Sequence, residues 1–163
     1  MREFVHRGDE GMGLNAEQRR RFEELSAARK KRSRTLAVER IKAEMREDIR
    51  DFDKRYEFAE EAVADKLKET LDALPCWKPG GIDFTRLEHR EITPETAESR
   101  RVWFCSLCGS EEIFDVFVSG ELSDFLSDYD IWSYYGAYML LMFEDFGGFV
   151  YIDDNGKMTE AVI

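Results

Sequence analysis

The chain has 163 residues, of which 43 % are hydrophobic and 36 % are charged, and its formal net charge is −11. This length suits one domain with an appendage or two small units, and no apolar run approaches the roughly 18–20 residues that span a bilayer. The chain starts without an apolar signal-peptide core and has three cysteines, an odd number. These features argue against membrane-spanning and secreted, disulfide-framed proteins and predict a cytoplasmic protein.

The charge changes sign along the chain. Residues 1–34 carry 10 Lys/Arg and 6 Asp/Glu, a net +4, whereas residues 75–163 carry 6 and 17, a net −11. After Val102 the single basic residue is Lys157, against 12 acids. A charge distribution of this kind affects the sign of the partner and the rate of association more than the fold.

The N-terminal segment begins without a recognisable period. The first dozen residues, which include His6, contain several glycines and are expected to be frayed. Asn15 and Gln18 then have the spacing of a capping box, which predicts a helix start. Residues 1–34 are therefore predicted to form a basic, partly flexible helical segment.

The stretch "ARKKRSRT" weakens the apolar stripe of this first helix and predicts a break near Ser33–Thr35. The basic residues within 29–34 could contact phosphates. They equally suit a solvated helix end, where cations complement the helix dipole, and no aromatic residues alternate with them for base stacking. Nucleic acid is therefore an unlikely partner, and segment 29–34 is its only candidate site.

Apolar residues recur in steps of three and four from Val38 to Leu74, with a mean step of 3.6 residues. A coiled coil would hold nearer 3.5. The period predicts one long helix over 35–74 that lies on its own protein, with a solvated charged face and an end at Pro75. A homodimer paired through this helix is also compatible with the pattern.

Strand and helix patterns alternate in the remaining acidic part. "IDFTRLEHREI" predicts a short strand, and "RVWFCSL" and "EIFDVFV" predict two strands joined by a hairpin turn. Ser119 is expected to cap a short helix that follows. Residues 131–146 are apolar throughout; their length favours a helix, although a buried strand at "YMLLMF" would show the same pattern. "FVYIDDNGKMTEAVI" predicts a C-terminal hairpin that turns at Asn-Gly.

These elements predict an α+β fold in which N-terminal helices, the second one long, pack on a small, mainly antiparallel sheet with short helices and a C-terminal β-hairpin. Residues 35–163 would form a single α+β domain, composed of the long helix 35–74 and the acidic, sheet-containing part 75–163.

Cys105 and Cys108 stand in a Cys-x-x-Cys-Gly pattern, which zinc knuckles use to present two thiolates to one ion. A structural zinc needs four ligands, and a second such pair is missing. Cys76 and His89 could complete a site, with His6 as a further candidate. The apolar neighbours favour free cysteines packed as small hydrophobic residues instead, so we predict no metal ligand and no cofactor.

No nucleophile motif, phosphate-binding glycine loop or calcium loop is present, so no catalytic residue is predicted. Acids beside aromatic residues in the C-terminal part suit a surface that binds a basic partner, with charge steering at its rim. The predicted partner-binding residues are Glu121, Asp124, Asp128, Asp130, Trp132, Tyr134, Glu144 and Asp145.

The sequence thus predicts a non-catalytic acidic interaction protein, inhibitor or immunity-like, that binds a basic surface on a partner protein. One alternative is a small zinc-supported regulatory or nucleic-acid-associated protein that uses Cys105, Cys108 and the basic N-terminal helix. Another is a structural dimer built on the long helix.

Overall fold

A computed structural model describes residue 13 and residues 15–163 of the chain. The predicted fraying of the first dozen residues, and the position of His6, lie outside the described residues. The chain divides into two units, Met1–Ala37 and Val38–Ile163. Within the described part, no helix combines the length and the apolar character needed to cross a membrane.

Helix α2 (Ala16–Asp48) is one continuous helix. Its predicted cap is confirmed: Asn15 Oδ1 accepts from the Gln18 amide at 2.8 Å, and Gln18 Oε1 accepts from the Asn15 amide at 3.0 Å. The predicted break near Thr35 is wrong. Arginine and lysine favour helices even without an apolar stripe, and the Thr35 hydroxyl donates to the Lys31 carbonyl within the helix at 2.9 Å.

The predicted helix over 35–74 has the wrong bounds, because α2 ends at Asp48. Three shorter elements follow it: α3 (Phe52–Arg55), β1 (Glu57–Phe58) and α4 (Glu61–Asp72). Asp51 adopts the left-handed conformation with φ 55°, which turns the chain after α2. The apolar stripe looked continuous because Ile49 and Tyr56, which lie in this connection, are buried as well.

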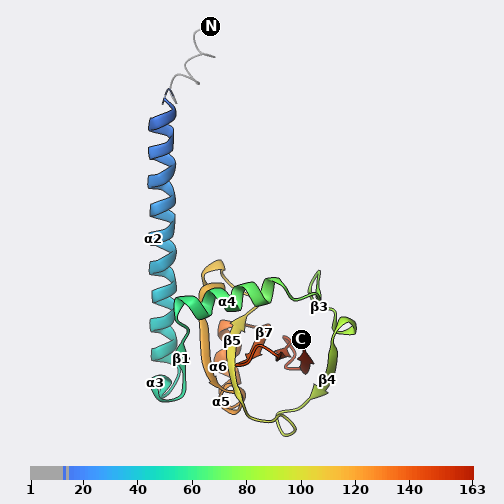
Figure 1. The fold of residues 1–163 in the computed structure, drawn as a ribbon. Helices are drawn as coiled ribbons and strands as arrows, with labels where there is room; N and C mark the ends of the chain where they lie inside the picture. Colours follow the sequence, from blue (N-terminus) through green and yellow to red (C-terminus); the bar gives the residue numbers. More distant parts are fainter. Residues whose placement is uncertain (1–12, 14) are drawn as a thin grey trace. The chain divides into compact units, whose positions relative to one another are not determined.

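Seven strands form one sheet in the order β1-β6-β5-β7-β8-β9-β4, and all neighbouring pairs are antiparallel. Its other strands are β4 (Glu88–Ile92), β5 (Arg101–Ser106), β6 (Phe117–Glu121), β7 (Met139–Phe143), β8 (Gly148–Ile152) and β9 (Met158–Val162). Figure 1 labels β1, β4, β5 and β7 of this sheet. The hairpin β8–β9 confirms the C-terminal prediction, and Gly156 supplies a left-handed residue in its turn, with φ 80°. The α+β fold class is confirmed.

Short elements connect these strands: β2 (Trp77–Lys78) paired with β3 (Gly81–Ile82), η1 (Phe84–Arg86), η2 (Glu111–Asp115), α5 (Leu122–Ser127) and α6 (Tyr129–Tyr135). The strand predicted at "EIFDVFV" is wrong in its first half, which is η2. There the Ile113 amide donates to the Ser110 carbonyl at 3.1 Å, so the segment turns instead of extending. Ser119 lies inside β6 and does not cap α5.

Residues 131–146 do not form the helix that their length favoured. Helix α6 ends before Gly136, and β7 begins at Met139. A Cβ atom at Gly136 would lie 2.8 Å from Ser106 Oγ, so only glycine allows the chain to pass so close to β5. All five residues of β7 are buried because both faces of this central strand are covered, which explains the absence of alternation.

Side chains alternate between two buried clusters on the two faces of the sheet. Along β5, Val102 and Phe104 belong to the first cluster, and Cys105 belongs to the second. The C-terminal part of α2, together with α3, α5 and α6, covers the first face, whereas α4 and the β2–β3 hairpin cover the second. The sheet is therefore the middle of three layers.

The strands have two ends that differ in charge. At the end where β5 starts, Arg101 pairs with Glu121, and Val102 pairs with Phe143; we call this the Arg101 end. At the opposite end, Ser106 pairs with Met139, which in turn pairs with Ile152; we call this the Ser106 end.

Candidate functional site

The cysteines and His89 do not form a metal centre. Cys105 is buried in β5, where burial raises the pKa of its thiol and Sγ donates to the Trp103 carbonyl at 3.5 Å. Cys76 is also buried, whereas Cys108 is exposed. Over residues 13 and 15–163, no group of three His, Cys, Asp or Glu residues could hold a metal ion. The alternative zinc site is therefore not assembled there.

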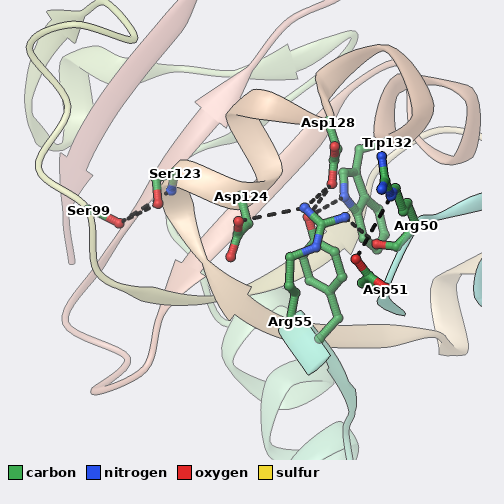
Figure 2. Close-up of polar contacts among 9 residues, drawn as sticks. Arg50, Asp51, Arg55, Ser99, Ser123, Asp124, Asp128 and Trp132 are labelled. Carbon is green, nitrogen blue, oxygen red and sulfur yellow. Dashed lines mark hydrogen bonds and ion pairs between the residues drawn. The ribbon is translucent and has the colours of Figure 1, made fainter. Parts of the chain in front are cut away.

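Two of the predicted partner-binding acids are bound by an arginine of the same chain. Arg55 Nη1 lies 2.7 Å from Asp128 Oδ2 and 3.6 Å from Asp124 Oδ1, and Arg55 Nη2 donates to the Arg50 carbonyl (Figure 2). Figure 2 shows the Arg55 side chain lying between these acids and the turn that precedes it. Asp124 and Asp128 thus hold α3 to α5 and offer little free charge to a partner.

Trp132 is a core residue with no exposed surface. Its ring contacts the rings of Phe104, Phe125 and Tyr56 at centroid distances of 4.7, 4.8 and 5.1 Å. The indole N–H donates to the Tyr56 hydroxyl at 3.3 Å, and that hydroxyl donates to Asp128 at 2.9 Å. Trp132 therefore cannot reach a partner at the surface, which corrects its predicted role as an anchor.

Three further predicted acids lie at the Arg101 end. Glu121 is 3.9 Å from Arg101, and Asp145 is 3.7 Å from Arg100. The Ser99 hydroxyl also donates to Glu121, at 3.3 Å. Glu144 is exposed in the β7–β8 turn beside them. Nearby arginines therefore offset much of the negative charge at this end.

The remaining predicted residues, Asp130 and Tyr134, lie on α6, and the Tyr134 side chain is 80 % exposed. The rings of Tyr134 and Tyr135 meet edge to face at 5.3 Å, and the Tyr135 carbonyl accepts from Ser106 at 3.0 Å. This contact places the end of α6 at the Ser106 end. The eight predicted residues therefore do not form one surface.

The Ser106 end brings acids and tyrosines together in a way that the sequence analysis did not foresee. The β8–β9 turn carries Asp153 and Asp154. These two carboxylates and Asp130 act electrostatically on Tyr129, and Asp153 and Asp154 also act on Tyr138. We call these five residues the tyrosine–aspartate surface. Its members come from α6, from the residue before β7 and from the hairpin turn.

The pKa values of Tyr129 and Tyr138 reflect the negative charge around these side chains. Burial raises the pKa of Tyr129, and the carboxylates of Asp153, Asp130 and Asp154 raise it further. The Asp154 carboxylate raises the pKa of Tyr138. Both phenols therefore stay protonated at neutral pH.

The turn that carries the acids is held by one of them. Asp153 Oδ1 accepts from the backbone amides of Asn155 and Lys157, each at 2.9 Å. The nearby Lys157 ammonium pairs with Glu91 at 2.8 Å. Among residues 15–163 no ion pair links a cation to the acids of the tyrosine–aspartate surface. The Lys157 ammonium also acts electrostatically on Asp153. The charge of this surface is still less offset than that of the Arg101 end, where Arg100 and Arg101 form ion pairs.

Sequence reasoning missed Asp153 and Asp154 because "DDNG" was analysed as a turn and as a failed calcium loop. The available signal was the hairpin itself, which exposes the acids at its tip. Recognising Tyr129 and Tyr138 as neighbours of these two acids required knowing that β8 pairs with β7 and that a strand, not a helix, begins at Met139.

Comparison of the chain with protein-family models, with curated proteins and with solved structures finds no match.

Proposed function

We propose that this protein is a non-catalytic interaction protein, inhibitor or immunity-like, whose tyrosine–aspartate surface binds a basic surface on a partner protein. The observation that carries the proposal is the convergence of Asp130, Asp153 and Asp154 on Tyr129, and of Asp153 and Asp154 on Tyr138, with no ion pair from a cation to these acids among residues 15–163. Neighbouring carboxylates repel one another, and cations of a partner would relieve that repulsion.

The tyrosines suit the same task. Tyr129 and Tyr138 are half-buried, so each ring is held in place while part of it remains open to a partner. Tyrosine contributes a large contact area with little loss of side-chain entropy, and its hydroxyl keeps a polar contact at the edge of an interface. Aromatic residues surrounded by charge are typical of interfaces steered by electrostatics.

The charge of the whole C-terminal part adds to the attraction. Residues 75–163 carry a net −11, so a basic partner would be drawn to this part of the chain before contact. We place this interaction in the cytoplasm, and the free thiols of Cys76, Cys105 and Cys108 support a reducing compartment.

The test uses the full chain and two labelled peptides, one arginine-rich and one with citrulline at each arginine position. Fluorescence anisotropy measures the dissociation constant at several salt concentrations. The arginine-rich peptide should bind, and binding should weaken steeply with salt, because the screening length falls from about 10 Å at 0.1 M to about 3 Å at 1 M.

Two variants with equal charge change locate the contact. The first replaces the surface acids as Asp130→Asn, Asp153→Asn and Asp154→Asn, and it should weaken binding by about tenfold or more. The second is the control and replaces three exposed acids, as Glu88→Gln, Glu98→Gln and Glu144→Gln. Equal losses in both variants would mean that only total charge matters, and the proposal would be wrong.

A further inference from the structure

A hollow of about 400 Å³ opens at the Ser106 end, beside the tyrosine–aspartate surface. The β2–β3 hairpin, the loop after β5, the residue before β7 and strand β8 all contribute to its walls. The lining side chains are Trp77, Lys78, Leu107, Cys108, Tyr138 and Tyr151. Three of these six residues are aromatic.

The aromatic walls are held in position by contacts of their own. The Trp77 indole N–H donates to the Leu71 carbonyl at 2.7 Å, while the side chain stays 40 % exposed. Tyr151 is nearly buried, and its ring lies 5.7 Å from that of Phe84. A site whose aromatic side chains are fixed before binding loses little entropy when a ligand enters.

Carboxylates stand beside these rings. The Asp154 carboxylate raises the pKa of Tyr138, and burial, followed by Asp153, raises the pKa of Tyr151. The hollow thus combines π faces with nearby negative charge. The faces of tyrosine and tryptophan rings attract cations, and this attraction grows when the cation is partly desolvated.

We infer that this hollow binds one cationic side chain of the basic partner, and that the planar guanidinium of an arginine fits it best. The inference rests on the proposed function and names the group that the partner inserts. A guanidinium stacks on aromatic faces and still donates hydrogen bonds at its edge, so it can contact Trp77 and Tyr138 while facing Asp154.

Among the described residues, Lys78 is the one cationic side chain that lines the hollow. Hydrogen bonds with Thr85 lower the pKa of Asp83 in the neighbouring turn, and the charge of Lys78 lowers it further, so its ammonium is within electrostatic range of that carboxylate. A like charge at the rim opposes an incoming cation. Removing the charge of Lys78 is therefore expected to strengthen the binding of a cation. The binding of an apolar ligand would not depend on this charge.

The experiment adds N-acetyl-arginine amide to the full chain and follows the indole N–H signals of the three tryptophans by NMR. The neutral isostere N-acetyl-citrulline amide is the matched probe. The arginine probe should shift the Trp77 signal saturably. The citrulline probe should bind more weakly by at least about fivefold. The buried Trp132 serves as an internal control. Equal binding of both probes, or shifts that spare Trp77, would overturn the inference.

Variants test the walls. Tyr138→Leu should weaken binding of the arginine probe by about fivefold, Tyr138→Phe should keep most of it because the ring remains, and Lys78→Gln should strengthen it by about twofold. An unchanged Trp132 signal shows that each variant is folded. Binding that is the same in Tyr138→Leu as in Tyr138→Phe would contradict the inference.

The failure of this inference can be separated from failure of the proposed function. If arginine-rich peptides bind through the three aspartates while the small arginine probe leaves Trp77 unchanged, the surface binds cations without using the hollow, and the inference alone fails. If the peptides do not bind, the proposed function fails, whatever the small probe does.

Discussion

Nη1 of Arg55 lies 2.7 Å from Oδ2 of Asp128, and the two side chains are only 26 % and 22 % exposed. The same carboxylate accepts a hydrogen bond from the Tyr56 hydroxyl at 2.9 Å. Such a pair differs from a surface ion pair, because removing one partner leaves the other charge partly buried without compensation. Asp128 is therefore a structural residue that links α5 to the segment around α3.

Replacing Arg55 with alanine is expected to lower the free energy of unfolding by about 1–3 kcal/mol, the range for hydrogen bonds to charged groups. Urea unfolding at neutral pH measures the change. Arg50→Ala is the matched control, because the Arg50 side chain is 93 % exposed and its carbonyl, which accepts from Arg55, remains. Equal unfolding midpoints for the two variants would refute this role of Arg55.

Stability is expected to fall at alkaline pH, and Tyr135 contributes to the loss. Its hydroxyl donates to Asp48 at 2.7 Å, and burial, followed by that carboxylate, raises the pKa of Tyr135. Below about pH 10 the phenol is protonated in both states and its contribution is complete. Above that pH the unfolded state releases a proton that the folded state keeps, so the free energy of unfolding decreases as the pH rises.

The measurement is urea unfolding from about pH 8 to about pH 11. Tyr135→Phe should make the alkaline decrease in stability less steep, because one of the groups that titrate differently in the two states is gone, while Tyr56, whose pKa is raised by burial, remains. Tyr134→Phe changes an exposed side chain on the same helix and should leave the pH profile as it is. Profiles of equal slope for Tyr135→Phe and the unmodified chain would contradict the prediction.

Local signals in the sequence were sufficient for the fold class. The Asn15–Gln18 cap and the turn at Gly156 depend on a few neighbouring residues, so the sequence could predict them. The prediction of one helix over 35–74 was wrong because the apolar residues near the turn at Asp51 follow a helical spacing but are buried in a connection that is not one continuous helix. The prediction of a helix over 131–146 was wrong because a strand that is covered on both faces shows no alternation of apolar and polar residues.

The candidate site could be predicted only in part, because counting acids does not show which of them are paired. Asp124, Asp128 and Asp130 look alike in the sequence. The first two meet Arg55, from a distant segment of the chain, whereas Asp130 acts on Tyr129 together with Asp153 and Asp154. Long-range pairing of this kind has no local signal, so the choice among acids needed the fold.

Leu67 on α4 is expected to contribute strongly to stability. It is fully buried against the second face of the sheet, so Leu67→Ala should lower the free energy of unfolding by about 2–5 kcal/mol through lost burial and a residual cavity. Leu36→Ala removes the same atoms from a leucine on α2 that is 61 % exposed. It should change stability by less than about 0.5 kcal/mol in the same urea unfolding experiment. Similar losses for both leucines would contradict the assignment of α4 to the core.

The stable core is expected to survive removal of residues 1–37. Every described residue of the two buried clusters lies at or after Val38, which coincides with the start of the second unit. A chain that begins at Val38 should unfold cooperatively, with a loss of at most about 1 kcal/mol from the new, uncapped helix end.

A chain that begins at Pro75 lacks Met45, Phe52 and Leu67, which are buried on the two faces of the sheet. It is expected to show no cooperative transition, because both faces would be uncovered. Thermal melts followed by circular dichroism compare the two truncated chains with the full one. A cooperative melt of the chain from Pro75, or its absence in the chain from Val38, would show that the core has been placed in the wrong part of the molecule.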